Sequence, residues 1–291
     1  MMNEPTCNRI ICGDARTVLQ NLPSETVDCI VTSPPYYKQR DYKHTLQIGN
    51  ENTVQDYIQR LLQVFAECKR VLTHKGTLWL NIGDKFSNGQ LLGLPWRVAF
   101  GLVDQGWNLR SDIIWHKPNA MPHSAKNRPT VDHEYLFLFA KSSDYYYDAD
   151  AIREPHVTFT EKSRMRGGRN HFGKRNGTPE QGKNEGNSNL HDGRWDQAFH
   201  PLGRNKRTVW SVPLGKNRDA HFAVFPEKLI EPCVFAGSPS GGLVLDPFLG
   251  TGTVAVVAKR LGRCYLGVDL NPKYVEIATE RVNQEQLVLF S

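Results

Sequence analysis

The sequence predicts an α/β protein built on a doubly wound, mostly parallel sheet. Short apolar runs alternate with amphipathic stretches along most of the 291 residues, a pattern typical of a parallel sheet covered by helices on both faces. Two turns, Thr32-Ser33-Pro34-Pro35-Tyr36 and Asp246 to Thr253, each follow an apolar run. Open sheets of this class bind ligands at the carboxyl ends of their strands, so both turns are candidate binding sites.

The first half of the chain contains three predicted strands and one long helix. Residues 9–12 form an apolar run that ends at Gly13-Asp14, and residues 27–31 form a second run that two prolines cut off. Residues 54–72 carry apolar side chains at spacings of three and four, which predicts an amphipathic helix. A third strand is expected at residues 77–82, after Lys75-Gly76 ends that helix.

Helices and strands are expected to continue alternating up to residue 140 and again after residue 208. A helix is expected at residues 94–105 and strands at 111–115 and 134–140, the last nearly all apolar and therefore buried on both faces. Toward the end, helices are expected at 225–235, 253–261 and 272–283, and strands at 243–245 and 264–268.

The excess positive charge lies in one irregular segment. The net charge is +6, and residues 161–208 hold 11 Lys and Arg against 5 Asp and Glu, so they carry all of it. The same residues include 8 Gly and 6 Asn without periodicity, and the segment is too long for an ordinary connection. We expect an inserted segment whose basic face binds a polyanion, the alternative being a solvated basic loop. The expected divisions are 1–145, the insertion 146–208, and 209–291.

Composition argues against membrane, metal and secreted classes. No apolar run approaches the ~20 residues of a membrane span, and the first residues do not resemble a signal peptide. The six cysteines, at positions 7, 12, 29, 68, 233 and 264, never form a C-x-x-C pair. We therefore expect no metal site, and scattered free thiols suit a reducing cytoplasm.

The glycine turn predicts a cofactor site. A strand, then Gly250-Thr251-Gly252, then a helix lets a ligand approach backbone amides closely. Asp269, at the end of the next strand, is placed to accept the hydroxyls of a ribose. A nicotinamide enzyme is one alternative, since the glycines fit the relaxed dinucleotide fingerprint. Asp246 would repel a pyrophosphate but attract an ammonium, so a nucleoside bearing an amino acid, such as S-adenosylmethionine, fits better.

The proline turn predicts a site for an amino group. Pro34 and Pro35 lack N–H groups, so the turn offers acceptors and few competing donors. The Ser33 oxygen and the Pro34 carbonyl could accept the hydrogens of an exocyclic base amino group and favour a more nucleophilic nitrogen. Tyr36 offers an aromatic face on which a base could stack. Such a turn could also be a plain loop when taken in isolation.

Together, the two turns resemble those of the amino-directed DNA methyltransferases, in the permuted order where the catalytic motif precedes the cofactor motif. The segments Ile11 to Asp14, Asp112 to Asn119, His133 to Tyr135 and His221 to Pro226 resemble further family segments. The resemblance implies a Rossmann-like, seven-stranded methyltransferase sheet, S-adenosylmethionine as cofactor and double-stranded DNA as substrate. It implies that the target base is held by Ser33, Pro34, Pro35 and Tyr36, and the cofactor by Asp14, Asp246, Phe248, Gly250, Gly252 and Asp269.

Ser33 sets the expected base. In this family, Ser at the first motif position is associated mostly with cytosine-N4 methylation, and Asp or Asn mostly with adenine-N6, so cytosine is expected and adenine is the alternative. The base must be flipped out of the duplex. Phosphate or guanine contacts are expected from the insertion, namely Arg164, Arg166, Arg169, Lys174 and Arg175.

Other functions and partners stay open at this point. A nicotinamide-dependent oxidoreductase and a non-catalytic DNA-binding module are the alternatives from other classes. The resemblance suggests a restriction endonuclease as partner and a cytoplasmic protein of bacterial, archaeal or phage origin. Residues Gln286 to Phe290 resemble a sliding-clamp-binding peptide, although an apolar tail packed on its own core is the favoured explanation.

Overall fold

The protein is built on one eight-stranded sheet, described here from a computed structural model that covers residues 7–40, 44–155, 202–215 and 225–285. The strand order is β1-β10-β9-β2-β3-β7-β6-β8. The strands are β1 (Arg9–Cys12), β2 (Val27–Thr32), β3 (Leu72–Ile82), β6 (Asn108–His116), β7 (His133–Ala140), β8 (Val209–Ser211), β9 (Leu243–Asp246) and β10 (Cys264–Asp269). The predicted α/β class is therefore confirmed, with eight strands in place of seven.

The eighth strand is a short edge strand, and only one strand runs against the others. β8 has three residues and pairs in parallel with β6. β7 pairs antiparallel with both β3 and β6, while every other pairing in the sheet is parallel. The sheet is thus mostly parallel, as the sequence predicts.

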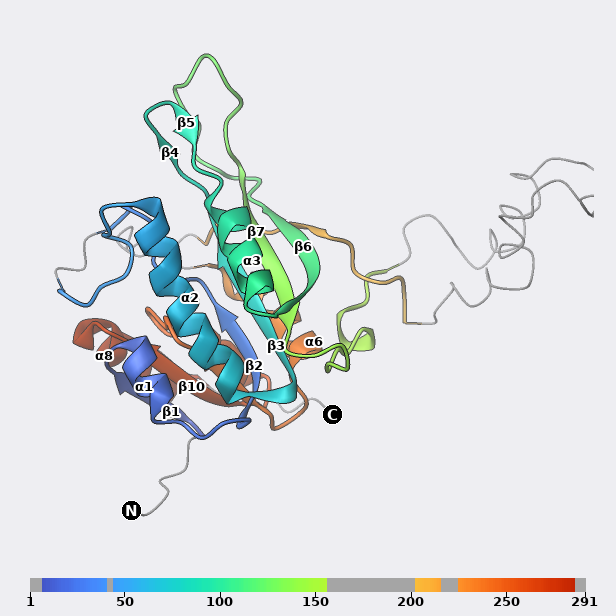
Figure 1. Cartoon of the computed structure of the whole chain (residues 1–291). Coiled ribbons are helices and arrows are strands. Elements are labelled where there is room, and N and C mark those ends of the chain that lie inside the picture. The colour runs from blue at the N-terminus through green and yellow to red at the C-terminus, as the bar shows by residue number, and fades with distance from the viewer. Residues whose placement is uncertain (1–6, 41–43, 156–201, 216–224, 286–291) are drawn as a thin grey trace, which may run out of the picture. The chain divides into compact units, whose positions relative to one another are not determined.

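Helices cover both faces of the sheet. Helices α1 (Ala15–Gln20), α2 (Val54–Val71) and α3 (Leu94–Asp104) pack on one another and lie in front of the sheet in Figure 1. Helices α6 (Glu227–Gly237), α7 (Thr253–Arg260) and α8 (Pro272–Gln284) pack together as well, with α6 against β2 and β3 and α7 against β9 and β10. This is the doubly wound arrangement.

Buried side chains explain why these segments adopt these elements. In α2, the Thr53 hydroxyl caps the first turn by accepting a hydrogen bond from Asp56 N–H. The three-and-four spacing places the side chains of Tyr57, Leu61, Phe65 and Cys68 on the face of the helix that is buried in the core. Strand β7 is buried from Leu136 to Ala140, because both of its faces are covered.

Besides the edge strand β8, four short elements were not predicted. Helix α1 is only six residues long, and the Asp14 carboxylate caps it by accepting from Thr17 N at 2.9 Å. The strands β4 (Phe86–Ser87) and β5 (Gln90–Leu91) form a separate hairpin, and Asp150–Ile152 is a single 3₁₀ turn. Each of these is too short to carry a periodic apolar pattern.

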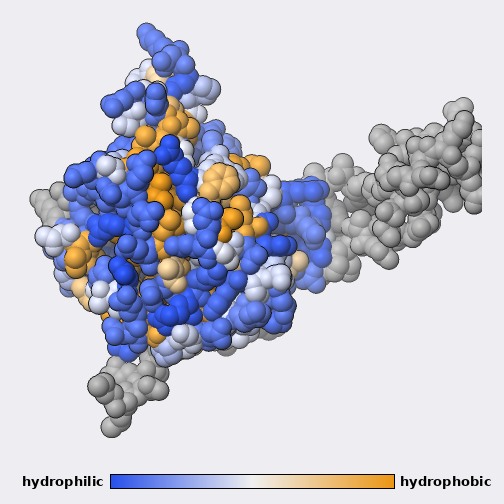
Figure 2. Space-filling view, viewed as in Figure 1, coloured by the Kyte–Doolittle hydropathy of each residue, from blue (hydrophilic) through white to orange (hydrophobic). Residues whose placement is uncertain are grey.

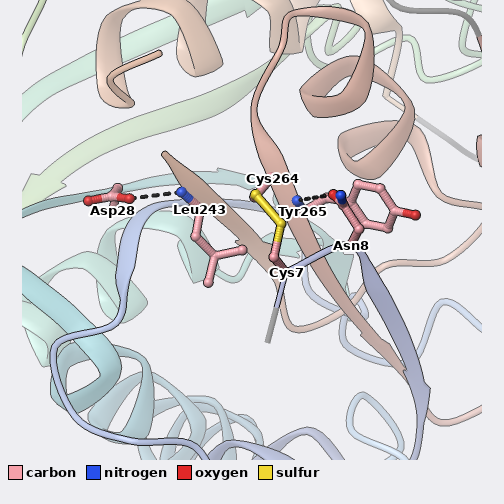
Figure 3. Close-up of a disulfide and its surroundings, with 6 residues drawn as sticks. All are labelled: Cys7, Asn8, Asp28, Leu243, Cys264 and Tyr265. Atoms are coloured by element: carbon pink, nitrogen blue, oxygen red, sulfur yellow. Dashed lines mark hydrogen bonds between the residues drawn. A yellow bond between two sulfur atoms is a disulfide. The ribbon is translucent and has the colours of Figure 1, made fainter. Parts of the chain in front are cut away.

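The expectation that all six cysteines remain free thiols is wrong. Cys7 and Cys264 form a disulfide, shown in Figure 3, across a sequence separation of 257 residues. The pairing agrees with the sheet register, because β1 and β10 are parallel with Arg9 opposite Leu266. Cys7 lies two residues before Arg9, and Cys264 lies two residues before Leu266. Cys12, Cys29, Cys68 and Cys233 are free.

The chain divides into two compact units. One comprises residues 1–148 and 207–291 and contains the sheet, and the other comprises residues 149–206. In the second unit, Glu154 and Arg204 exchange backbone hydrogen bonds of 2.9 and 2.8 Å, which pairs the two ends of the segment between them. The predicted division into a catalytic half, an insertion and a cofactor half, with boundaries at 145/146 and 208/209, stays a prediction.

In the described part of the chain, no helix has the length and apolar character needed to cross a membrane.

Candidate active site

The two predicted turns meet at one end of the sheet. β2 and β9 are adjacent and parallel, and their chains leave in opposite directions, toward β3 and toward β10. Their carboxyl ends therefore form the point where the strand order reverses. The Thr32 hydroxyl donates to Asp246 Oδ1 at 2.6 Å, although 214 residues separate them in the sequence.

A cavity of about 560 Å³ opens beside this contact. Most of the predicted site residues line it, namely Asp14, Ser33, Pro34, Pro35, Tyr36, Phe248, Gly250 and Asp269. Asp246 and Gly252 do not line the cavity. Residues of both predicted turns therefore line the cavity, because the sheet brings the two turns together.

Two carboxylates hold the glycine turn. Asp269 accepts Gly250 N–H and Asn271 N–H, one on each oxygen and both at 2.8 Å, and its burial raises its pKa to about 6. Asp246 Oδ1 accepts Phe248 N–H at 3.0 Å in addition to the Thr32 hydroxyl. Asp246 Oδ2 is buried without a hydrogen-bond partner among the described residues, and burial raises the pKa of this carboxyl to about 7. A buried acceptor left open in this way suits a cationic donor.

Gly250 and Gly252 have different roles. A Cβ on Gly250 would meet nothing within 4 Å, and this glycine lines the cavity. A Cβ on Gly252 would lie 2.8 Å from Ala278 Cβ and 2.9 Å from its Cα, so this glycine lets α7 approach α8. Of the two predicted cofactor glycines, only Gly250 therefore faces the open space.

This difference predicts opposite defects for two alanine variants. Gly252→Ala is expected to lower the free energy of unfolding by about 2–4 kcal/mol, because it combines a backbone contact with a φ of 89°. Gly250→Ala, at a φ of 55°, should lose only about 1–2 kcal/mol but fill the cavity wall. Urea unfolding and ligand-binding measurements on both variants test this, and equal stability losses would contradict it.

The proline turn is held by a chain of hydroxyl and carboxylate groups. The Ser33 hydroxyl donates to the Tyr36 oxygen at 3.3 Å, and the Tyr36 hydroxyl donates to Glu134 Oε2 at 2.6 Å. Burial and the Glu134 carboxylate raise the pKa of Tyr36 well above its usual value, so the phenol keeps its proton. Lys117 Nζ forms an ion pair with the other oxygen, Glu134 Oε1.

The backbone of the turn is anchored from α2. The Tyr57 hydroxyl donates to the Pro35 carbonyl at 2.9 Å. The hydrogen-bond chain from Ser33 to Lys117 and this anchor fix the turn from two sides. The Ser33 oxygen can then accept a hydrogen from the cavity side, since its own proton points toward Tyr36.

Three residues of this site were not predicted as functional. Asn81 is the last residue but one of β3, with its side-chain oxygen 3.4 Å from the Tyr36 hydroxyl. Lys117 follows β6, and Glu134 is the second residue of β7. All three line the cavity. Lys117 and Glu134 lie in segments whose resemblance to the family is noted above, and that resemblance is the only signal that could have pointed to them. The predicted DNA contacts Arg164, Arg166, Arg169, Lys174 and Arg175, and the segment Gln286 to Phe290, lie outside the described residues.

A family model described as DNA methylase, of the N6 and N4 type, matches residues 27–280. The chain belongs to this family. The methylase is 42% identical to the type II methyltransferase M.Cfr9I of Citrobacter freundii, over 94% of this chain and 87% of the relative. It is 39% identical to M.SmaI of Serratia marcescens, over 94% and 90%. The resemblance stated from the sequence is thereby confirmed.

Solved structures agree with the fold of the methylase. A protein of Thermus thermophilus assigned as a DNA modification methylase, solved in complex with S-adenosyl-L-methionine, matches with a TM-score of 0.61 at 27% identity, over 96% of this chain and 95% of that one. The cytosine-N4-specific PvuII DNA methyltransferase matches with a TM-score of 0.67 over 94% and 86%, and at 17% identity this likeness concerns the fold alone.

Proposed function

We propose that this methylase transfers the methyl group of S-adenosylmethionine to the exocyclic amino group of a base flipped out of double-stranded DNA, the base being cytosine methylated at N4. The observation that carries the proposal is that the proline turn and the glycine turn, 214 residues apart, share one cavity. Positioning two reactants against each other in one site supplies a large part of the rate of such transfers.

The residues of the glycine turn fit the cofactor. Asp246 does not line the cavity, but its Oδ2 is buried without a partner in the described residues at the start of the glycine turn, and we assign the ammonium to it. Asp269 and Asp14 line the cavity and offer carboxylates to ribose and adenine. Gly250 leaves room for close approach of a ligand to the backbone. When bound, S-adenosylmethionine supplies an electrophilic methyl group on its sulfonium.

The proline turn is suited to prepare the amino group. The Ser33 oxygen and the Pro34 carbonyl accept its two hydrogens, which reduces delocalisation of the nitrogen lone pair into the ring. Because Ser33 donates toward Tyr36, and Tyr36 toward Glu134, the serine presents a lone pair and not a proton to the base. The nitrogen carries a positive charge once it is methylated and then releases a proton, so this chemistry needs no strong general base.

DNA contacts from the insertion complete the proposal. Flipping a base costs about a few kcal/mol, and contacts from Arg164, Arg166, Arg169, Lys174 and Arg175 to phosphates would offset that cost. The type II methyltransferases among the relatives support a cognate restriction endonuclease as partner and a cytoplasmic location in a bacterium.

The choice of cytosine rests on Ser33 and is tested by nucleoside analysis. The chain is incubated with duplex DNA and S-adenosylmethionine labelled in the methyl group, and the DNA is digested and separated. We expect label in N4-methylcytosine, and none with a Tyr36→Ala control. Label in N6-methyladenine would overturn the base assignment. Folded protein that binds the cofactor but labels no base would overturn the activity, and binding of NAD in its place would favour an oxidoreductase.

A further inference from the structure

Two connections at the cavity end of the sheet form a projecting arm. The first, residues 84–93, contains the β4–β5 hairpin and follows β3, and the second, residues 117–132, joins β6 to β7. Figure 1 shows the two connections rising side by side from the sheet. Asn81, near the end of β3, and Lys117, the first residue of the second connection, both line the cavity, so the arm begins at the rim of the candidate active site.

The arm is braced within itself. Asn88 and Gly89 have φ values of 50° and 76° and join β4 to β5 in a two-residue turn, with Phe86 opposite Leu91. The Arg128 guanidinium lies 3.6 Å from the centroid of the Phe86 ring, which ties the second connection to the hairpin. Asp84 Oδ1 holds the base of the hairpin by accepting Lys85 N–H and Leu94 N–H at 2.8 and 3.0 Å.

The outer part of the arm has the composition of a nucleic-acid contact. Residues 85–91 and 118–131 contain Lys85, Lys126 and Arg128 and no acidic residue. Figure 2 shows a hydrophilic outer end, and its exposed side chains include Ser87, Asn88, Gln90 and Asn127. Met121 is also 81% exposed. Amide side chains pair with base edges, cations with phosphates, and apolar side chains contact thymine methyl groups.

From this we propose that the arm, which nothing in the family comparison assigns, inserts into a groove of the duplex beside the flipped base. The inference rests on the proposed function for the identity of the substrate. A two-stranded ribbon fits the major groove, and the rim of the cavity is where the duplex must lie if one of its bases is to enter. The outer part of the arm carries three basic residues and no acidic one, since Asp84 and Asp132 lie at its base, and this favours a polyanion over a protein partner.

The test measures the dissociation constant for duplex DNA as a function of salt. Lys126→Ala and Arg128→Ala are each expected to reduce the slope of log K against log salt by about 0.9, and the double variant by about 1.8. Asn88→Asp keeps the turn, because Asp tolerates positive φ, and should weaken binding through repulsion of phosphates. Lys75→Ala is the matched control, since Lys75 is exposed and lies toward the other end of β3.

The outcomes separate this proposal from the proposed function. If the wild-type chain methylates DNA but all four arm variants bind with the wild-type constant and slope, the arm proposal is wrong and the function stands. If Lys75→Ala changes the dissociation constant and the salt slope as much as the arm variants do, the effect comes from the net charge of the protein and not from the arm. That result would also overturn the proposal. If the wild-type chain labels no base, the function fails, while the salt slopes still decide whether the arm binds duplex DNA.

Discussion

Replacing Glu134 by glutamine is expected to lower kcat for DNA methylation about a hundredfold, with a much smaller change in KM. Lys117 Nζ pairs with one oxygen of Glu134, and the Tyr36 hydroxyl donates to the other at 2.6 Å. A glutamine would turn its carbonyl toward Lys117 and its NH₂ toward Tyr36. The Tyr36 proton would then point to Ser33, which at 3.3 Å is slightly nearer than the other acceptor, Asn81 Oδ1 at 3.4 Å, and the Ser33 proton would point into the cavity. A serine that donates there would repel the hydrogens of the target amino group.

A second substitution separates this effect from simple damage. In the double variant Lys117→Met with Glu134→Gln, no cation holds the amide oxygen, so the glutamine can accept from Tyr36 again. We expect kcat to recover partly relative to Glu134→Gln alone. The methionine still fills the space beside the Trp115 ring, but without the ammonium that lies 4.6 Å from the ring centroid. Steady-state kinetics with both variants decide the matter. If Lys117 and Glu134 act only as a structural ion pair, the double variant will be no more active than the single one.

The strands and long helices were predictable because the spacing of their apolar residues in the sequence matches the period of the element that buries them. Helix α2 begins at Val54, as its three-and-four spacing predicts, and ends at Val71, within one residue of the expected end. Strand β7 was predicted because residues 135–140 are all apolar, and five of them, Leu136 to Ala140, are buried. The Asn88-Gly89 hairpin was missed although this dipeptide is a strong turn signal, because its strands have only two residues each.

The polar chain behind Tyr36 could not be predicted in the same way. Glu134 follows Tyr36 by 98 residues, and it reaches the tyrosine because β7 runs antiparallel beside β3. The direction and order of strands are set by the packing of the whole sheet, which no local pattern records. The disulfide between Cys7 and Cys264 has the same origin, since it depends on the register of β1 against β10.

The affinity for S-adenosylmethionine is expected to fall as pH decreases from 7.5 to 5.5. Asp246, with a pKa of about 7, and Asp269, with a pKa of about 6, are both raised chiefly by burial, so the free protein takes up protons in this range. An ammonium and ribose hydroxyls bind the ionised forms, so cofactor binding must release these protons. Affinity should therefore drop about tenfold per pH unit between 7 and 6, and more steeply below. Isothermal titration calorimetry in buffers of different ionisation enthalpy also counts the protons released.

Asp246→Asn distinguishes a binding role from a structural one. The asparagine oxygen can still accept from Thr32 and Phe248, but its NH₂ replaces the open Oδ2 and repels an ammonium. Affinity at pH 7.5 is expected to fall about tenfold to a hundredfold, and its pH dependence above 6 to flatten.

The stability of the same variant should change in the opposite direction. A carboxyl whose pKa is raised in the folded state destabilises the fold as pH rises from about 4, with the full penalty reached above about 7. Asp246→Asn removes that penalty, so the cofactor-free variant should melt at a higher temperature than the wild type at pH 8. Asp269→Asn is the matched control. It also removes a burial penalty, but a smaller one, since the pKa of Asp269 is about 6, and its NH₂ would oppose one of the two backbone N–H groups that the Asp269 oxygens accept, so this variant should melt lower. A lower melting temperature for Asp246→Asn, with unchanged affinity, would make Asp246 a structural residue and leave the ammonium to another group.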